Sequence, residues 1–542
     1  MVLKNSFNFI NEFFFYIIRS VRKLYLKSSF YNKKISKINN NVLSYKPTLS
    51  ILSCLVKYEK KKNKIEDFNV NSIWENNKIT DKDYKKLHNF YWLFSIDLKS
   101  SKKITQSIIK NWIINNQNYK PLNWEIDTLS KRVIAWISNS IITYEDSENN
   151  YKIKFNEIIN KQVNHLINEI NSSDLDDNKM IGCTAIIMTG ISYNNIKFLS
   201  YGLNLLKKII NSDFDNQYFP KSRNIRQLAF YLKYFVLIRE LLKESLNEIP
   251  EYLDEIIFYL GKAYNFSCGS IKKSLLFNGN HQGDLSDFDK YLYLHRYNFK
   301  SETHEMGGYA ILKNKNFVIA MDVGSTPEKK FSENFQSGPL SFEIFFKDNK
   351  LISNSGYFQD HNHQLNRISK SNAAHSTLIL NNSSACTFKK NKKGPNIIDK
   401  GFKLFNKNIV YQKNYWSIKG SHDGYLPDYG IIHERTLEFY PEINKIIGKD
   451  KLIKEKNIKS SNFEIRFHLI PNVKVTKIQD NRTILIELDN SGWRFYSKDG
   501  SIDVETGLYF GNKNVFNENQ NIFISGITQK EDQLIEWEIS KI

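Results

Sequence analysis

The sequence predicts an α+β multidomain fold in which a helical domain precedes an antiparallel β-sandwich. Three observations support this prediction: the length of the chain, a helical period of apolar residues in its first half, and a period of two in its second half. At 542 residues the chain exceeds the size at which one hydrophobic core stops growing, so we expect two large domains. Hydrophobic residues make up 41% of the sequence, which is enough to supply two cores.

Apolar residues recur at helical spacing from about residue 85 to residue 265. One stripe comprises Phe155, Ile158, Ile159, Val163, Leu166, Ile167 and Ile170, and Asn, Lys and Glu lie between them. A second stripe covers residues 228–242. Successive amphipathic helices joined by short polar loops form an all-α domain. We therefore expect a helical domain over residues 85–300, preceded by an N-terminal helical extension over residues 1–84.

The apolar period changes from 3.6 to 2 after about residue 300. Apolar and polar residues alternate over residues 463–469 and again over residues 535–540. Turn signals such as Lys347-Asp348-Asn349 and Lys498-Asp499-Gly500 separate many short runs of this kind. Strands in this order and spacing predict an antiparallel sandwich over residues 301–542.

The chain is basic, with a formal net charge of +20. That charge suits an acidic partner such as a polyanionic glycan, a nucleic acid or an anionic membrane. Nucleotide bias explains it about equally well, because Lys, Asn and Ile are abundant along the whole chain. The sequence contains no recognised nucleic-acid-binding module, so we expect no specific nucleic-acid partner.

The cysteines and the N-terminus exclude some classes of protein. Cys54, Cys183, Cys268 and Cys386 lack the spacing of metal ligands or of a disulfide framework. The apolar run of residues 7–18 lacks a small-residue cleavage site and is too short to span a membrane. It predicts either an ordinary amphipathic first helix or a helix that lies on a membrane surface.

Several motifs together resemble the heparinase II/III-like family of polysaccharide lyases. In the helical half the resemblance rests on Trp124-Glu125, residues 132–136, residues 162–165, Arg223-Asn224 and residues 276–279. In the second half it rests on Gly308-Tyr309, residues 322–324, Leu340-Ser341-Phe342-Glu343, residues 373–377, residues 421–425, residues 433–435 and residues 467–469. The order of these motifs is specific for the family.

The resemblance implies a fold and a reaction. It implies an incomplete α/α toroid over residues 85–300, a β-sandwich over residues 301–542, and β-elimination on a uronic-acid polysaccharide. The C5 proton of a uronic acid is weakly acidic, so a donor must neutralise the carboxylate while a Tyr or His moves protons. It also implies a location in the cell envelope or periplasm, although a cytoplasmic location stays open because no cleavable signal is present.

Two sets of residues that the resemblance leads us to expect are absent. His375 matches a ligand of the structural zinc in the characterised lyases, but the co-ligand positions are Gln336 and Asn354, which are poor zinc ligands. We therefore predict no metal and no other cofactor. The position of the family's catalytic His before the Leu-Ser-Phe-Glu strand is occupied by Asn334.

Three residues are candidates for acid–base catalysis. His375 is a candidate general base or carboxylate donor, and a buried structural His is the alternative. His422 and Tyr425 stand close together in an expected loop and suit an acid and base pair, whereas a turn stabilised by Asp423 and Gly424 is the alternative.

Four residues are candidates for binding the substrate. Arg223 and Asn224 precede a long apolar helix and suit a carboxylate clamp, with helix capping by Asn224 as the alternative. Arg367 lies in an expected polar loop, and Asn178 weakly matches the family's helical-domain Asn. Arg435 is expected to pair with a carboxylate such as Glu343.

The sequence supports two functions of different classes. The first is a polysaccharide lyase that cleaves an acidic glycan by β-elimination without a cofactor. The second is a catalytically degenerate protein that binds a glycan or takes part in assembly of envelope polysaccharide. We expect the two to differ in whether His375, His422, Tyr425 and a helical-domain Asn or Arg converge on one site. The sugar, its linkage and the oligomeric state do not follow from the sequence.

Overall fold

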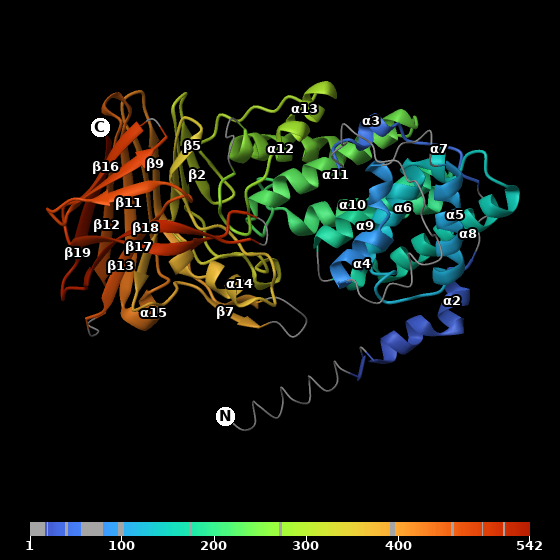
Figure 1. The fold of residues 1–542 in the computed structure, drawn as a ribbon, viewed down its shortest axis with the longest axis horizontal. Helices are drawn as coiled ribbons and strands as arrows, with labels where there is room; N and C mark the ends of the chain where they lie inside the picture. Colours follow the sequence, from blue (N-terminus) through green and yellow to red (C-terminus); the bar gives the residue numbers. More distant parts are fainter. Residues whose placement is uncertain are drawn as a thin grey trace. The chain divides into compact units, whose positions relative to one another are not determined.

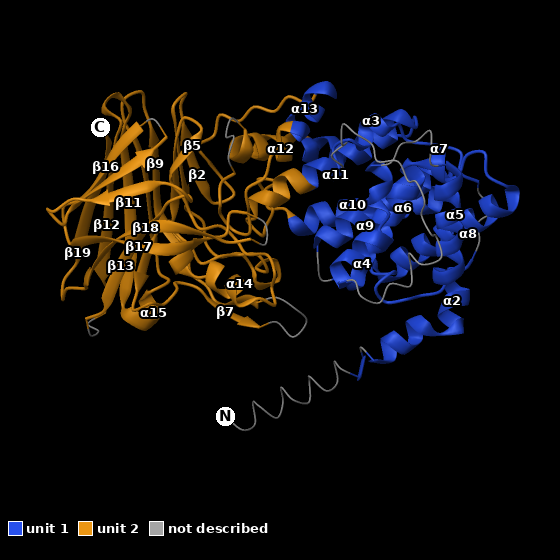
Figure 2. Ribbon diagram, viewed as in Figure 1, with its two compact units in different colours: residues 1–213, 231–257, 287–296 blue, residues 214–230, 258–286, 297–542 orange. Residues whose placement is uncertain are grey.

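The structure is a computed structural model of residues 1–542 (Figure 1). It describes residues 17–18, 20–37, 42–55, 80–95, 102–173, 176–269, 274–390, 396–456, 460–489, 491–512 and 515–542. The chain forms two compact units (Figure 2). Unit 1 comprises Met1–Asp213, Tyr231–Ile257 and Asp287–Arg296, and unit 2 comprises Phe214–Phe230, Phe258–Ser286 and Tyr297–Ile542. Unit 2 thus includes two segments that precede residue 300 in the sequence.

The described part of the chain before residue 300 is helical, as the apolar period predicts. Its α-helices are α2 Ser29–Ile35, α3 Leu49–Leu52, α4 Asp81–His88, α5 Lys102–Asn116, α6 Ile126–Ser138, α7 Ser140–Thr143, α8 Asn149–Glu169, α9 Asp176–Ser192, α10 Ile196–Asp213, α11 Ile225–Glu244, α12 Glu251–Cys268 and α13 Ser286–Leu294. Short 3-10 helices lie at Tyr91–Ser95 and Ile170–Ser172. The part of the chain that the structure describes has no helix long and apolar enough to cross a membrane.

Helices α9 and α10 of unit 1 pack closely against each other. All residues of α9 from Met180 to Ser192 are buried. Gly190 of α9 lies so close to α10 that an added Cβ atom would stand 2.5 Å from the backbone nitrogen of Leu199. Gly202 of α10 has the same relation to Ile187, with 2.5 Å between an added Cβ and a side-chain carbon. Both glycines therefore allow the two backbones to approach.

The second half of the chain consists mainly of antiparallel strands. They are β1 Glu305–Met306, β2 Tyr309–Lys313, β3 Phe317–Asp322, β4 Phe342–Phe346, β5 Asn349–Ile352, β6 Leu378–Leu380, β7 Thr387–Lys390, β8 Asn396–Lys400, β9 Leu404–Tyr411, β10 Trp416–His422, β11 Ile431–Tyr440, β12 Lys445–Lys454, β13 Asn462–His468, β14 Lys474–Lys477, β15 Thr483–Leu488, β16 Ser491–Ser497, β17 Ser501–Tyr509, β18 Asn517–Ile527 and β19 Gln533–Lys541. Between them lie the helices α14 Gln364–Ser369 and α15 Leu426–Tyr429, and the 3-10 helices η3 Lys329–Phe331, η4 Asn372–Ala374 and η5 Pro441–Ile443.

Three large sheets share one apolar core. Their strand orders are β1-β2-β3-β4-β5, β14-β15-β16-β19-β12-β11-β10-β9 and β17-β18-β13-β6, and β7 and β8 form a separate hairpin. Trp537 of the eight-stranded sheet stacks on Phe342 of β4 and meets Phe467 of β13 edge-on, with ring centroids 5.5 and 4.8 Å away. This packing explains the strict alternation of buried and half-buried residues along β11.

A buried ion pair ties β4 to β5. The Lys350 ammonium donates to both carboxylate oxygens of Glu343 at 3.0 and 2.9 Å, and neither side chain is exposed. The same carboxylate accepts hydrogen bonds from the backbone N–H groups of Leu276 and Asn354. Glu343 therefore joins a segment before residue 300 to the sandwich, and the sequence-based pairing of Glu343 with Arg435 is wrong.

We expect Lys350→Met to destabilise unit 2 strongly, because it removes the countercharge of a buried carboxylate. Loss of one partner of a buried pair costs about 3–5 kcal/mol. Lys389→Met is the matched control, since Lys389 pairs with Asp399 at 2.9 Å where both side chains are about half exposed, and such pairs contribute about 1 kcal/mol or less. Urea unfolding measures both changes, and equal effects of the two would contradict this assignment.

Candidate functional site

A buried ion pair joins Arg223 to Asp322 in unit 2. The guanidinium donates to Asp322 Oδ1 at 2.5 Å and to four backbone carbonyl oxygens, those of Gly307, Gly308, Gly324 and Ser325, at 2.9–3.2 Å. The pKa of Arg223 is raised, because burial opposes the charged form but Asp322 and Tyr309 together outweigh that effect. The arginine therefore fastens the segment before α11 to the loops around β2 and β3.

Asn278 and Gln336 extend this network from Asp322. The Asn278 amide N–H groups donate to Asp322 Oδ2 at 3.1 Å and to the Tyr309 hydroxyl at 2.6 Å, and its oxygen accepts from the Gln336 backbone N–H at 3.2 Å. The Gln336 side chain accepts from the backbone N–H of Gly279 at 2.9 Å and donates to the carbonyls of Gly356 and Ser369 at 3.0 and 2.6 Å. Hydrogen bonds among buried groups thus join six chain segments, at residues 278–279, 309, 322, 336, 356 and 369.

This network corrects the role expected for Arg223. Its side chain is only 9% exposed, and every one of its nitrogens already donates to a protein oxygen. A carboxylate clamp needs free donors, so Arg223 serves the fold instead of a ligand.

Asn224 caps α11, the alternative weighed for it, and the clamp role stays a prediction. Its Oδ1 accepts from the backbone N–H of Arg226 at 3.0 Å, which caps α11. Its Nδ2 is buried without a hydrogen-bond partner among the described residues. A Cβ atom added to Gly279 would stand 2.8 Å from this Nδ2 and 2.7 Å from Asn334 Cβ, so the three residues are neighbours. The free N–H group therefore lies near the half-buried Asn334.

A partly exposed histidine contacts Glu333, the residue that precedes Asn334 in the sequence. His361 Nε2 is 3.3 Å from Glu333 Oε1, and its Nδ1 is 3.4 Å from the Tyr357 hydroxyl. The His361 and Glu333 side chains are 29% and 26% exposed, so solvent reaches both. We call the set of Asn224, Arg226, Gly279, Glu333, Asn334, Tyr357 and His361 the Asn224–His361 cluster.

Tyr357 contributes a buried hydroxyl to this cluster. Burial raises the pKa of its hydroxyl well above the ordinary value, and Glu333 adds to that shift, while hydrogen bonding by Asn366 and the charge of Arg226 oppose it. Tyr357 therefore stays protonated at neutral pH and can give up a proton only while another group takes it.

The residues at the positions of the family's zinc ligands do not fit a zinc ion. The oxygen of each amide is already used, since Gln336 accepts from Gly279 N–H and Asn354 accepts from Ser376 N–H at 2.9 Å. What remains at Asn354 is an amide N–H without a partner in the described structure, and an N–H group does not bind a cation. In the part of the chain that the structure describes, no group of three His, Cys, Asp or Glu could hold a metal.

His375 is buried at the end of η4. Its Nδ1 donates to the carbonyl of Ser371 at 2.9 Å, which leaves Nε2 as an acceptor without a partner among the described residues. Burial lowers the pKa of His375 to about 4, partly offset by that hydrogen bond. The ring is therefore neutral, and at 1% exposure it does not reach solvent.

His422 is not in a loop, contrary to the sequence-based expectation. It ends strand β10, is fully buried and pairs in register with His433 of β11. His422 Nδ1 accepts from Gly424 N–H, so its Nε2 donates to His433 Nδ1 at 3.2 Å, and His433 Nε2 donates to Asp450 Oδ1 at 2.7 Å. Burial holds the pKa of His422 well below its ordinary value, helped by His433 and Arg435. Its position therefore fits a core hydrogen-bond chain and not an acid open to a ligand.

The side chains of Tyr425 and Arg435 are also buried and form hydrogen bonds inside the sandwich. The Tyr425 hydroxyl donates to the Leu378 carbonyl at 2.8 Å and accepts from Asn372, and burial raises its pKa. Arg435 pairs with Asp450 at 2.7 Å instead of Glu343. The structure therefore does not bring His422 and Tyr425 into a site with Arg223 and Asn224.

The two other candidates for substrate binding have different surroundings. Arg367 is exposed in the last turn of the short helix α14, next to Asn366. Asn178 is half-buried in the first turn of α9 in unit 1. Binding of a substrate by either residue stays a prediction.

Sequence reasoning missed Glu333, Tyr357 and His361. A signal for one of them was present, because Tyr357 directly follows the Asn-Ser-Gly strand end that carries the family resemblance. Residues 357–363 also include His361 and His363 in a polar stretch between strands. The contact between His361 and Glu333 joins two loops that are distant in sequence, so no local sequence pattern predicts it.

Comparisons with known proteins agree with this architecture. Residues 299–538 match the family described as "Heparinase II/III-like, C-terminal". Heparinase III superposes with a TM-score of 0.67 at 15% identity, covering 94% of this chain and 88% of that chain. A mutant of the heparan sulfate lyase HepC from Pedobacter heparinus gives a TM-score of 0.67 at 12% identity, covering 94% of this chain and 85% of that one.

A curated relative is the FtsZ-localized protein C of Caulobacter vibrioides. It is 22% identical over 250 residues, which are 43% of this chain and 42% of that protein. The match thus spans about two fifths of the length of this relative.

The helical segment followed by an antiparallel sandwich defines a protein of the heparinase III fold class. Residues 299–538 are a heparinase II/III-like C-terminal domain, and the chain shares the heparinase III fold over nearly its full length. The fold and the family resemblance expected from the sequence are both confirmed.

We expect unit 2 to lose stability as the pH falls from about 6.5 toward 4. Burial lowers the pKa of His375 to about 4, and burial together with Arg466 lowers that of His468 to about 3, whereas the unfolded chain takes up these protons near pH 6.5. Below pH 6.5 the unfolded state therefore binds more protons than the folded state. The free energy of unfolding is highest above pH 6.5 and falls as the pH decreases, by roughly 3 kcal/mol per histidine at pH 4. Urea unfolding at pH 7 and pH 5 measures the loss, which His375→Gln should reduce; an unchanged pH dependence in that variant would contradict the assignment.

Proposed function

We propose that this protein binds an acidic polysaccharide at the Asn224–His361 cluster of unit 2. The observation that carries the proposal is the Asn224 Nδ2, which has no partner in the described structure and lies near Gly279 and Asn334. Asn224 is 1% exposed, so a ligand reaches this donor only after a covering side chain moves. A buried donor without an acceptor costs about 1–3 kcal/mol. A carboxylate oxygen of a ligand offsets that cost, and the nearby Arg226 favours a negative charge.

The fold supports this choice of ligand. The heparinase III fold implies polysaccharide binding at most, and the net charge of +20 suits an acidic one. The residues that would make the family's reaction straightforward are absent, because Asn334 and Gln336 replace side chains that the family resemblance leads us to expect. The name of the relative in Caulobacter vibrioides refers to localisation with FtsZ and assigns no reaction. We therefore place binding ahead of cleavage.

β-Elimination is the second candidate, favoured by the partly exposed His361 between Glu333 and Tyr357. In this reaction His361 takes the C5 proton, the C4–O bond breaks, a C4=C5 double bond forms, and Tyr357 gives its proton to the leaving oxygen. Asn224 and Asn334 would hold the carboxylate during the proton transfer. Asn178 and Arg367 stay candidates for contacts farther along the chain of sugars.

We propose a location at the cell envelope, where acidic polysaccharides are found.

We expect Asn224→Asp to weaken binding of a uronic-acid polysaccharide about tenfold or more, a change of about 1.4 kcal/mol. The carboxylate keeps an oxygen that caps α11 but replaces the free N–H donor with a negative charge. Calorimetric titration with a panel of uronic-acid glycans measures the affinity.

Ultraviolet absorbance of the unsaturated product in the same samples tests elimination. His361→Ala should slow this reaction by roughly two to four orders of magnitude.

Asn195→Asp is the matched control for this experiment. Asn195 caps α10 by accepting from Phe198 N–H at 3.1 Å, and its Nδ2 is likewise buried without a partner in the described residues, but it lies in unit 1. Equal losses of affinity in both variants, or no binding by the wild-type protein to any glycan of the panel, would reject the proposal. Binding without an unsaturated product would reject elimination alone.

A further inference from the structure

The N-terminal helix of unit 1 presents an uncovered apolar face. This helix is described at residues 17–18 and 20–27, and α2 follows it after a bend at Ser28. Its exposed apolar side chains are Ile17, Ile18, Val21, Leu24 and Tyr25, and Leu24 is 71% exposed. At about 100° per residue these five positions fall within an arc of about 120° on one side of the helix.

The opposite side of the same helix is attached to the rest of unit 1. Leu26, which lies on that side, is 7% exposed. Arg22 at the edge of the apolar arc forms an ion pair with Glu169 at the end of α8, with 2.5 Å between Nη2 and Oε2. The helix therefore has a fixed inner side, and its apolar arc points away from the body of unit 1.

The segment after the bend continues this surface. Phe30 of α2 is 70% exposed, and its ring lies 6.4 Å from that of Tyr25. Tyr31 and Ile35 on the other side of α2 are buried, and the Tyr31 hydroxyl bonds His165 Nδ1 of α8 at 2.7 Å. Both helical segments are thus bound to unit 1 by one side and expose large apolar side chains on the other.

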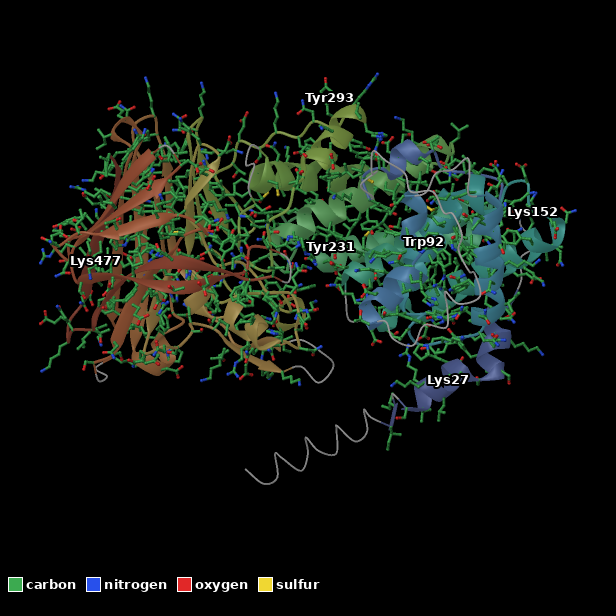
Figure 3. All side chains as sticks on the ribbon, viewed as in Figure 1. Lys27, Trp92, Lys152, Tyr231, Tyr293 and Lys477 are labelled. Atoms are coloured by element: carbon green, nitrogen blue, oxygen red, sulfur yellow. The ribbon has the colours of Figure 1, made fainter. Side chains whose placement is uncertain are left out.

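The charged residues that this segment itself contributes are all positive. The sequence has no Asp or Glu between residues 13 and 58, whereas residues 19–37 contain Arg19, Arg22, Lys23, Lys27, Lys33, Lys34 and Lys37. Lys23 and Lys27 are exposed, and Lys27 is labelled on this helix in Figure 3. A helix with an apolar face and flanking lysines lies in the plane of a lipid surface, with the apolar side chains among the acyl chains and the lysines at the head groups.

We propose that residues 17–30 bind the protein peripherally to a membrane surface that contains anionic lipids. Charge complementarity favours this occupant over a second copy of the chain, because two such helices would bring their lysines together. The aromatic side chains Tyr25 and Phe30 suit the boundary between head groups and acyl chains. This inference concerns unit 1 and does not depend on the proposed glycan site.

Co-sedimentation with lipid vesicles tests the proposal. We expect the full chain to bind vesicles that contain phosphatidylglycerol and to bind phosphatidylcholine vesicles far more weakly. Leu24→Glu should lower binding about tenfold or more, since it places a charge in the apolar arc. Replacing both Lys23 and Lys27 with Gln should lower binding to anionic vesicles roughly fivefold per lysine, and added salt should have a similar effect.

Ile196→Glu is the matched control, because Ile196 is a 78% exposed apolar residue at the start of another helix of unit 1. It should bind like the wild-type protein. Leu24 makes little buried contact, so Leu24→Glu should melt at the wild-type temperature. Absence of wild-type binding, equal binding by Leu24→Glu, or a self-association that Leu24→Glu abolishes while vesicle binding persists would overturn the proposal.

Discussion

The buried ion pair of Arg223 and Asp322 is the interaction on which the arrangement of unit 2 depends. Arg223 precedes α11, and Asp322 ends β3 about a hundred residues later in the chain. Through Asn278 and Gln336 the pair is continuous with the loops that carry Gly279 and Gly356. Removing a partner from such a pair leaves an uncompensated buried charge. The network thus fixes the positions of the neighbouring polar groups, Asn224 and Asn334 among them, before any ligand arrives.

Amide side chains in this network stand where the family resemblance would lead one to expect metal ligands. A zinc ion joins segments through anionic and imidazole ligands, whereas Gln336 joins three segments through one acceptor and two donors. A zinc ion and the Gln336 amide can both hold loops together, but the amide adds no positive charge. The cluster holds the positive Arg226, the negative Glu333 and the donor Asn224 Nδ2, which has no partner among the described residues. We infer that this donor favours recognition of an acidic ligand over chemistry on it.

The sequence predicts the fold well because the apolar period is a local property. The same alternation along β11 places His433 and Arg435 on the face of Ile431, Leu437 and Phe439, so their burial was readable from the sequence. The role of His422 was not readable, since it depends on the pairing of β10 with β11. Likewise, the Glu333 to His361 contact and the uncovered donor of Asn224 arise from tertiary packing of separate loops.

Thermal unfolding after dialysis against a strong chelator, combined with elemental analysis, tests most directly whether amide hydrogen bonds take the place of a metal. We expect the purified protein to carry less than stoichiometric zinc and to melt at the same temperature before and after chelation. We expect Gln336→Ala to lower the melting temperature by several degrees. Stoichiometric zinc together with a melting temperature that falls on chelation would contradict it.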